Sequence, residues 1–352
     1  MTIQHVRVEG GSYQRGLQYG QQAADRVRRS VQAYQRTFEH FAGWDWATVR
    51  REAARFEAPV QAFRPAYVQE LRGIADGARL DLTDVLAINV RTEVMYAAQA
   101  RHAPRQTPQT PKTPKTPAEC SAFACVPAPG QQGPALIGQN WDWLLHSAQT
   151  IVVLEVRQDD GPDFVTVVEA GLLAKAGMNA AGLGLATNAM VTDALEALQG
   201  GPRSSSANYL IAHASGSALD IEAAPGDFTR LYPLYPENGV LLHTNHFLAP
   251  RLHAGPETDL SLWAMPSSQV RLQRLQAAQQ AANPRSLDDF QAILTDHADY
   301  PHSICAHPEP AAHPCEQGQT VASLLMDLTA GQLWLAAGNP CQAPYEQLTV
   351  KL

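Results

Sequence analysis

The sequence predicts an α+β fold in which mixed β-sheets are covered by helices. In the first hundred residues, apolar positions recur at intervals of three and four, which is typical of amphipathic helices. From Cys120 onward, short apolar runs alternate with Gly, Pro and Asn, which is typical of strands joined by turns. Strands and helices do not alternate regularly, so a doubly wound parallel sheet is not expected.

The N-terminal part is expected to contain one short strand followed by helices. The strand is predicted at residues 3–8. A long helix should follow, because its apolar positions share one face. A second helix is predicted at residues 60–78, and Leu82-Thr83-Asp84 favours the start of a third. The apolar positions of the long helix are Leu17, Ala24, Val27, Val31, Tyr34, Phe38 and Phe41.

The C-terminal part is expected to be rich in strands. Helical patterns return only at residues 270–282 and 286–297. The predicted strands, in chain order, are residues 121–126, 135–139, 151–156, 164–169, 183–188, 208–213, 218–223, 239–243, 321–328 and 332–337.

Residues 104–118, with the sequence PRQTPQTPKTPKTPA, separate the two parts. Each proline removes a backbone donor and restrains the residue before it, so helix and sheet are excluded there. An exposed, extended connector is expected, and composition alone makes it a linker. The predicted organisation is a helical segment 1–119 ending in this linker and a segment 120–352, which together form one folded domain.

Composition argues against several kinds of partner. The formal net charge is −8 at pH 7 and no block of Lys and Arg stands out, so no nucleic acid is expected. No run of 18 apolar residues is present, so no membrane span is expected. The opening residues MTIQHVRVEGGSYQRG lack the apolar core of a signal peptide, which predicts a cytoplasmic location.

The cysteines favour free thiols in a reducing compartment, because their number is odd and the chain is long. Cys305 and Cys315, with His302, His307 and His313, do not follow a standard zinc spacing. No GxGxxG or GxxxxGK[ST] loop is present. No metal and no cofactor are therefore expected. The five cysteines are Cys120, Cys125, Cys305, Cys315 and Cys341.

Cys120 is the residue best placed for covalent catalysis, because it directly follows the connector. If the Glu119–Cys120 bond were cleaved, Cys120 would carry a free α-amine, whose pKa in model compounds is about 8. That amine could accept the thiol proton directly or through a water molecule, so no histidine would be required. A buried structural thiol is the alternative. His243 and His246 suggest a Cys–His pair, but they carry no recognised protease signature.

Three further polar residues could support such a nucleophile. Asp142 lies in the polar and aromatic segment GQNWDW, predicted to be a turn, 22 residues after Cys120. Its carboxylate could orient a new α-amine and stabilise its charge. Asn188 ends the strand pattern GLGLATN and Asn245 lies in LLHTNHF, and asparagine side chains are neutral donors suited to an oxyanion hole. Each of the three could instead be an ordinary turn residue.

These motifs together resemble the acyl-coenzyme A:6-aminopenicillanic acid acyltransferase family. This family is a branch of the N-terminal-nucleophile (Ntn) hydrolases, related to choloylglycine hydrolase and acid ceramidase. The resemblance covers nearly the whole chain outside residues 100–118. It rests on the stretch from Cys120 to Trp143 and on GGSYQRGLQYG, GMNAAGLGLATN, RSSSANYLIAHASGSALDIEA, HTNHFL and TVASLLMDLTAGQLWLAAGNPCQ.

The resemblance implies an Ntn-hydrolase αββα sandwich, made as an inactive precursor (a zymogen). It also implies autocatalytic cleavage, in which the Cys120 thiol attacks the Glu119 carbonyl and an N-to-S shift and hydrolysis follow. Carried over by motif, Cys120 is the nucleophile, Asp142 the supporting carboxylate and Asn245 the oxyanion donor. Asn188 is implied to contact the substrate or the amine. The product would consist of α and β subunits, and a homo-oligomer is compatible with this reading.

The expected function is therefore hydrolysis of a carboxamide, or transfer of its acyl group, through an acyl-thioester on Cys120. Expected partners are a small-molecule amide substrate and, for transfer, an acyl acceptor such as an amine or coenzyme A. The alternatives are a choloylglycine-type N-acyl-amino-acid amidase and a non-catalytic Ntn-fold protein that binds an acyl compound. The resemblance also implies an arginine before the last long strand, where this chain has Gln317-Gly318-Gln319-Thr320. The missing arginine and the lack of a phosphate loop favour hydrolysis.

Overall fold

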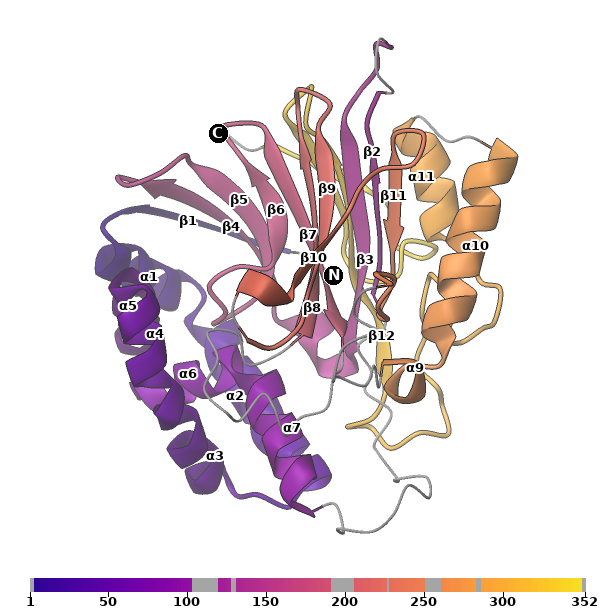
Figure 1. The fold of residues 1–352 in the computed structure, drawn as a ribbon. Coiled ribbons are helices and arrows are strands. Elements are labelled where there is room, and N and C mark those ends of the chain that lie inside the picture. Colours follow the sequence, from indigo (N-terminus) through magenta and orange to yellow (C-terminus); the bar gives the residue numbers. More distant parts are fainter. Residues whose placement is uncertain are drawn as a thin grey trace.

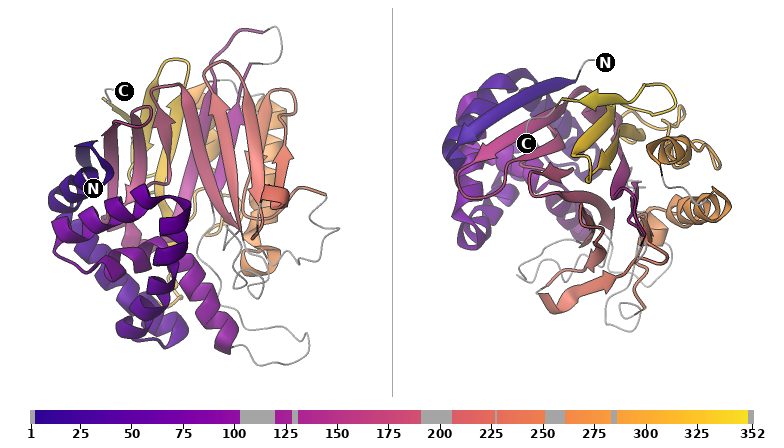
Figure 2. Two further views of the ribbon diagram at one scale, coloured as in Figure 1. Left: turned by 60° about the vertical axis from the view of Figure 1, so that its left-hand side comes forward. Right: turned by 90° about the horizontal axis from the view of Figure 1, so that it is seen from above.

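The computed structural model describes residues 3–102, 120–127, 131–190, 206–226, 228–250, 261–282 and 286–349. They form four layers, in the order helices, sheet, sheet, helices (Figures 1 and 2). The predicted αββα sandwich is thereby confirmed. The connector at residues 104–118 and Glu119 lie outside the described residues. In the described part of the chain, no helix is both long enough and apolar enough to span a membrane.

Among the described residues, the first sheet has eight strands in the order β1-β4-β5-β6-β7-β8-β9-β10. β1 runs parallel to β4, so the segment before Cys120 supplies a strand to a sheet that otherwise comes from the segment after it. The other pairs are antiparallel. The bounds are β1 (Gln4–Gly10), β4 (Ile151–Gln158), β5 (Phe164–Glu169), β6 (Ala176–Asn179), β7 (Leu183–Met190), β8 (Ser206–His213), β9 (Ala218–Ala223) and β10 (Leu231–Leu234).

In the same described part of the chain, the second sheet has six strands in the order β11-β2-β3-β12-β13-β14, and all neighbours are antiparallel. Every residue of β2 and β3 is buried, because the first sheet covers one face and helices cover the other. The bounds are β2 (Ser121–Cys125), β3 (Leu136–Leu144), β11 (Val240–His243), β12 (Gly318–Asp327), β13 (Gln332–Ala336) and β14 (Glu346–Leu348).

Helices form the two outer layers. The N-terminal helices lie along the eight-stranded sheet, and α10 and α11 lie along the six-stranded sheet (Figure 1). Phe123 of β2 stacks on Phe290 of α11 with ring centroids 3.7 Å apart, which ties the second pair of layers together. The helices within the described residues are α1 (Ser12–Gln22), α2 (Ala24–Ala42), α3 (Trp46–Ala53), η1 (Ala54–Phe56), α4 (Glu57–Phe63), α5 (Pro65–Ala78), α6 (Leu82–Asn89), α7 (Arg91–His102), η2 (Leu145–Gln149), η3 (Phe228–Arg230), α9 (Ser261–Ala264), α10 (Ser267–Ala282) and α11 (Leu287–Leu294).

All the predicted strands are present, but the predicted turn at GQNWDW is wrong. β3 continues through this segment to Leu144, and Asp142 lies directly opposite Thr320 of β12. Tertiary packing overrides the local pattern here. The polar residues of this segment suggest exposure, but two neighbouring strands and two covering layers bury it. The short strands β6, β10 and β14 were not predicted, since three or four residues carry too little pattern.

Two predicted helices are each divided in two. The helix predicted at residues 60–78 is interrupted at Arg64. This residue is extended (φ −153°, ψ 96°) because Pro65 follows it. The first breaks at Ala23, between α1 and α2. α1 crosses α5 in close backbone contact, and a Cβ built on Gly16 would lie 2.0 Å from the carbonyl oxygen of Glu70. α1 therefore uses glycines to pack, whereas α2 buries large apolar side chains against the core.

Gly16→Ala should destabilise the fold by about 1–3 kcal/mol, because the new methyl group forces α1 away from α5. Urea unfolding would measure the loss. Gly11→Ala is the matched control, since nothing lies within 4 Å of a Cβ built at that position. Equal unfolding midpoints for the two variants would contradict the close packing of α1 on α5.

Candidate active site

The predicted site residues Cys120, Asp142 and Asn245 belong to adjacent parts of the six-stranded sheet. Cys120 directly precedes β2, Asp142 lies in β3 and Asn245 follows β11. The strand order β11-β2-β3-β12 places these three elements side by side, with Thr320 of β12 next in line. Residues far apart in the sequence are therefore brought to one region of the sheet.

The Cys120 thiol is buried, with 2% of the residue exposed. Its Sγ lies 3.8 Å from the backbone carbonyl oxygen of Asp142, to which it donates. Burial raises the pKa of the Cys120 thiol, and although the cations of Lys175 and Arg271 act the other way, the net direction is upward. In the continuous chain the thiol is therefore held protonated, and a base must take its proton before it can attack a carbonyl.

The Asp142 carboxylate is fixed by a hydroxyl group. Thr320 Oγ1 donates to Asp142 Oδ1 over 2.6 Å, and both residues are fully buried. The Thr320 hydroxyl oxygen in turn accepts from the backbone N–H of Ala306 at 3.0 Å. The position of the carboxylate thus depends on the loop that precedes β12.

Arg271 of α10 is a site residue that sequence analysis did not identify. Its side chain is fully buried. Nη1 donates to the carbonyl oxygen of Cys120 at 2.6 Å and to Ser121 Oγ at 3.1 Å, and Nη2 donates to Asn245 Oδ1 at 2.9 Å. One guanidinium therefore joins the backbone of Cys120 to the predicted oxyanion donor Asn245.

A sequence signal for Arg271 exists in retrospect. Ser268, Arg271, Leu272 and Leu275 follow the spacing i, i+3, i+4 and i+7, so the arginine lies in the buried stripe of its helix. A charged residue within such a stripe needs internal partners. The family resemblance directed attention instead to residues 317–320, which carry no arginine.

Asn245 is fully buried and both ends of its amide are engaged. Nδ2 donates to the carbonyl oxygen of Ala189 at 2.8 Å, and Oδ1 accepts from Arg271. The backbone N–H of Asn245 donates to Ser268 Oγ at 2.8 Å. A role as oxyanion donor would use the second hydrogen of Nδ2, so this role stays a prediction.

Asn188 lies in the facing sheet, on β7. Its Oδ1 accepts from Gln139 Nε2 at 2.8 Å, and its Nδ2 donates to Asn208 Oδ1 at 3.2 Å. Gln139 belongs to β3, so this bond crosses from one sheet to the other. Asn208 continues the row by donating to Asp220. Asn188 is thus connected to the strand that carries Asp142, and its predicted contact with substrate remains a prediction.

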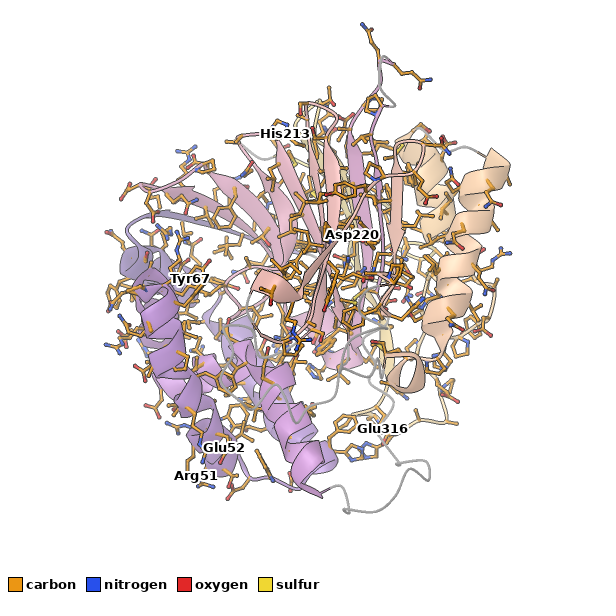
Figure 3. The ribbon with its side chains drawn as sticks, viewed as in Figure 1. Arg51, Glu52, Tyr67, His213, Asp220 and Glu316 are labelled. Carbon is orange, nitrogen blue, oxygen red and sulfur yellow. The ribbon has the colours of Figure 1, made fainter. Side chains whose placement is uncertain are left out.

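His243 belongs to a buried charged group with Asp220 and Glu222. Its ring nitrogens donate to Glu222 Oε1 and to the carbonyl oxygen of Thr244, each at 2.8 Å. Burial lowers the pKa of His243, but the carboxylates of Asp220 and Glu222 raise it by more, so the pKa lies above its usual value. Burial also raises the pKa of Asp220, labelled in Figure 3, to about 6. With both nitrogens donating, His243 is not available as a base for Cys120, in line with the absence of a Cys–His signature.

One further cation, Lys175, lies near Cys120, and another, Arg91, lies beside Trp143 of β3. Lys175 Nζ donates to Thr187 Oγ1 at 3.2 Å and lies 4.9 Å from the centre of the Trp141 ring. Burial lowers the pKa of Lys175, and the Cys120 thiolate opposes that shift. The guanidinium of Arg91 lies 5.1 Å from the centre of the Trp143 ring. Lys175, which sequence analysis missed, would favour a thiolate on Cys120.

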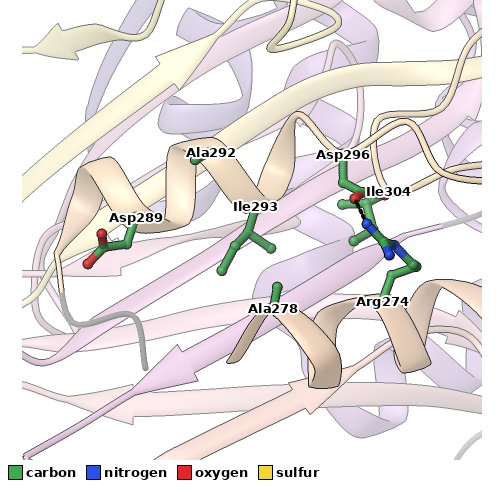
Figure 4. A pocket seen from close by; sticks show the side chains of 7 residues that line it. All are labelled: Arg274, Ala278, Asp289, Ala292, Ile293, Asp296 and Ile304. Atoms are coloured by element: carbon green, nitrogen blue, oxygen red, sulfur yellow. Dashed lines mark hydrogen bonds and ion pairs between the residues drawn. The ribbon is translucent and has the colours of Figure 1, made fainter. Parts of the chain in front are cut away.

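A pocket between α10 and α11 is separate from this site (Figure 4). Ala278 and Ile293 line it, and the ion pair of Arg274 with Asp296 lies at its edge. Its lining holds no cysteine, serine or threonine, and it belongs to the outer helical layer. It is therefore not a candidate for covalent catalysis.

Comparisons with known proteins agree with the motifs. A family model described as "Acyl-coenzyme A:6-aminopenicillanic acid acyl-transferase" matches residues 184–342. The "Acyl-coenzyme A:6-aminopenicillanic-acid-acyltransferase 40 kDa form" of Emericella nidulans is 23% identical over 364 residues, which cover 96% of this chain and 93% of the relative.

Two solved structures are similar at low scores. The N-acylethanolamine-hydrolyzing acid amidase (NAAA) ortholog of Caenorhabditis elegans has a TM-score of 0.39 and 11% identity, covering 60% of this chain and 93% of its own. A mutant of the conjugated bile acid hydrolase from Clostridium perfringens has a TM-score of 0.37 and 12% identity, and the match covers 66% of this chain and 97% of that hydrolase chain. On its sequence, this chain resembles the acyl-coenzyme A:6-aminopenicillanic acid acyltransferase family of Ntn hydrolases.

Proposed function

We propose that this protein is an Ntn cysteine amidohydrolase or acyltransferase that cleaves a carboxamide through an acyl-thioester on Cys120. The observation that supports the proposal best is the pair of hydrogen bonds made by Arg271. Its guanidinium donates both to the carbonyl oxygen of Cys120 and to the side chain of Asn245. The buried Asp142 carboxylate lies on the neighbouring strand. A thiol, a carboxylate and amide donors in one buried region are what acyl transfer requires.

Maturation would precede catalysis. The Cys120 thiol attacks the carbonyl carbon of Glu119, the peptide bond breaks with an N-to-S acyl shift, and the Cys120 nitrogen becomes an amine. Water then hydrolyses the thioester, which leaves a carboxylate on Glu119 and restores the thiol. The two chains would stay associated as α and β subunits, since β1 pairs with β4 along its whole length and Val6 and Val8 are buried.

In the mature protein the α-amine of Cys120 takes the thiol proton. The thiolate attacks the substrate carbonyl, and the developing oxyanion accepts a hydrogen bond from Asn245. The ammonium group returns its proton to the leaving amine, and the acyl group remains on sulfur as a thioester. The Asp142 carboxylate, held by Thr320, stabilises the ammonium charge.

We propose a reducing, cytoplasmic location, with which the five free cysteines agree.

We also propose that water is the acyl acceptor. Coenzyme A would need cationic groups for its phosphates. Arg271 and Lys175 already donate to groups within the protein. An acceptor pocket would also have to hold an amine or thiol close to the thioester to compete with water.

A panel of N-acyl amines should therefore yield free acids. With the best substrate, hydroxylamine, a simple amine or coenzyme A at micromolar concentration should divert little product, and millimolar acceptor should divert more. Mass spectrometry of the products measures the partition. Transfer that dominates at micromolar acceptor would show an evolved acceptor site, and no cleavage of any amide by the matured protein would favour the binding-protein alternative.

A further inference from the structure

Four potential metal ligands meet beside the loop between α11 and β12. His297, Cys305 and His307 belong to this loop, and Cys341 belongs to the segment between β13 and β14. Their ligand atoms all lie within 4.8 Å of one another. The Nε2 atoms of the two histidines are 3.1 Å apart, and the two sulfurs are 3.6 Å apart. His307 Nε2 lies 3.6 Å from Cys305 Sγ and 3.4 Å from Cys341 Sγ.

Three of these four separations fall in the range expected between the ligands of a tetrahedral zinc ion, and the distance between the two nitrogens is slightly shorter. Zinc binds sulfur at about 2.3 Å and imidazole nitrogen at about 2.0–2.1 Å, so tetrahedral ligand atoms lie about 3.3–3.8 Å apart. We propose that His297, Cys305, His307 and Cys341 bind one Zn²⁺ ion in a Cys₂His₂ site. Binding would release one proton from each thiol, while the neutral imidazoles coordinate through Nε2.

The surroundings favour bound thiolates. The amide Nδ2 of Asn339 donates to Cys305 Sγ over 3.6 Å, and it also donates to the carbonyl oxygen of Ala306. Such an N–H group stabilises a metal-bound thiolate and holds it in place. The ring of Tyr300 lies 5.2 Å from that of His307, so one side of the cluster is covered by an aromatic side chain.

Sequence spacing did not reveal this set. Cys305 and His307 were considered with His302, His313 and Cys315, whereas the structure joins them to His297 and Cys341. Two of the three rejected residues have other partners, because His302 pairs with Glu309 and His313 stacks on His40 of α2. Cys341 comes from a different loop, which is why no short motif contains the four ligands.

The location indicates what the ion would do. Ala306 lies between two of the ligands, and its backbone bonds to Thr320 through both N–H and carbonyl groups at 3.0 Å. Thr320 holds the Asp142 carboxylate. Four protein ligands leave no open position, so the ion would be structural and would fix the loop that positions Thr320.

Metal analysis tests the proposal without any assay of activity. The wild-type protein, purified without added metal or chelator and then given one equivalent of zinc, should retain about one ion per chain after dialysis. Cobalt should give the intense visible bands of a tetrahedral site and a sulfur-to-metal charge-transfer band. Removal of the metal by a chelator should lower the melting temperature, because the ion binds the folded state.

Variants identify the ligands. Cys341→Ser and His297→Asn should bind zinc at least about 10²-fold more weakly and lose the cobalt bands, and both parent residues are exposed enough for the variants to fold. Cys315→Ser and His302→Asn, in the same loop, are the matched controls and should behave like the wild type. Zinc binding that is weak in the wild type, or unchanged in Cys341→Ser, would overturn the site. So would a Cys305–Cys341 disulfide in freshly purified protein, seen as a mass two hydrogens lower.

Discussion

Replacing Cys120 by Ala should lower turnover of every amide that the wild type cleaves by about 10⁴-fold or more, because the acyl-thioester cannot form. Steady-state kinetics on the same panel of N-acyl amines would measure the loss. The matched control is Cys125→Ala, which removes the other buried thiol of the same segment but leaves the nucleophile. Its stability should fall modestly while its turnover stays close to that of the wild type.

This comparison also separates chemistry from folding. Circular dichroism of the two variants should be similar, since each removes one buried sulfur atom and leaves the fold in place. If Cys120→Ala retained more than about a tenth of the wild-type turnover, another group would be the nucleophile and the proposed function would be wrong.

Arg271→Gln should lower kcat/KM by about 10²–10³-fold, because the carbonyl oxygen of Cys120 and the side chain of Asn245 lose their shared donor. The same change should destabilise the fold by about 2–4 kcal/mol, since buried acceptors are left unsatisfied. Arg274→Gln, one turn along α10, is the control. Arg274 is 47% exposed and pairs with Asp296, so its loss should cost little in either measurement.

Arg271→Lys distinguishes positioning from a general need for positive charge. Lysine keeps the charge but cannot bind two acceptors in one plane as a guanidinium does, so only partial rescue of kcat is expected. Assays run well below the melting temperature of each variant would remove the contribution of unfolding. Full activity of Arg271→Gln in folded protein would show that the arginine supports the structure alone.

Local pattern was sufficient for most of the fold. The strands of both sheets alternate with Gly, Pro and Asn, so short-range chemistry locates them, whereas the break before Pro65 in the predicted helix at residues 60–78 was missed. The segment around Asp142 shows the limit. Its polar residues predict a turn, yet β3 runs through it because β2 and β12 pair with both of its edges. Which strands become neighbours is decided by long-range packing, which one sequence does not display.

The candidate site likewise contains residues that the sequence predicts and residues that only the structure reveals. Cys120, Asp142, Asn188 and Asn245 were identified because each lies next to or within a distinctive motif. Their partners were not, because Arg271 and Lys175 lie in segments whose composition is ordinary and which approach the nucleophile only in the folded chain. The cluster around His307 was missed for the same reason, since its fourth ligand comes from another loop.

Intact mass together with N-terminal sequencing tests whether Cys120 becomes an N-terminal nucleophile. Active wild-type protein should consist of two chains, residues 1–119 and 120–352, the second beginning with Cys120. A cognate amide trapped on the enzyme should add its acyl mass to the second chain alone. Cys120→Ala should remain one chain of 352 residues. Full activity of an uncut wild-type chain, or a cut at any other bond, would show that Cys120 does not become an N-terminal nucleophile.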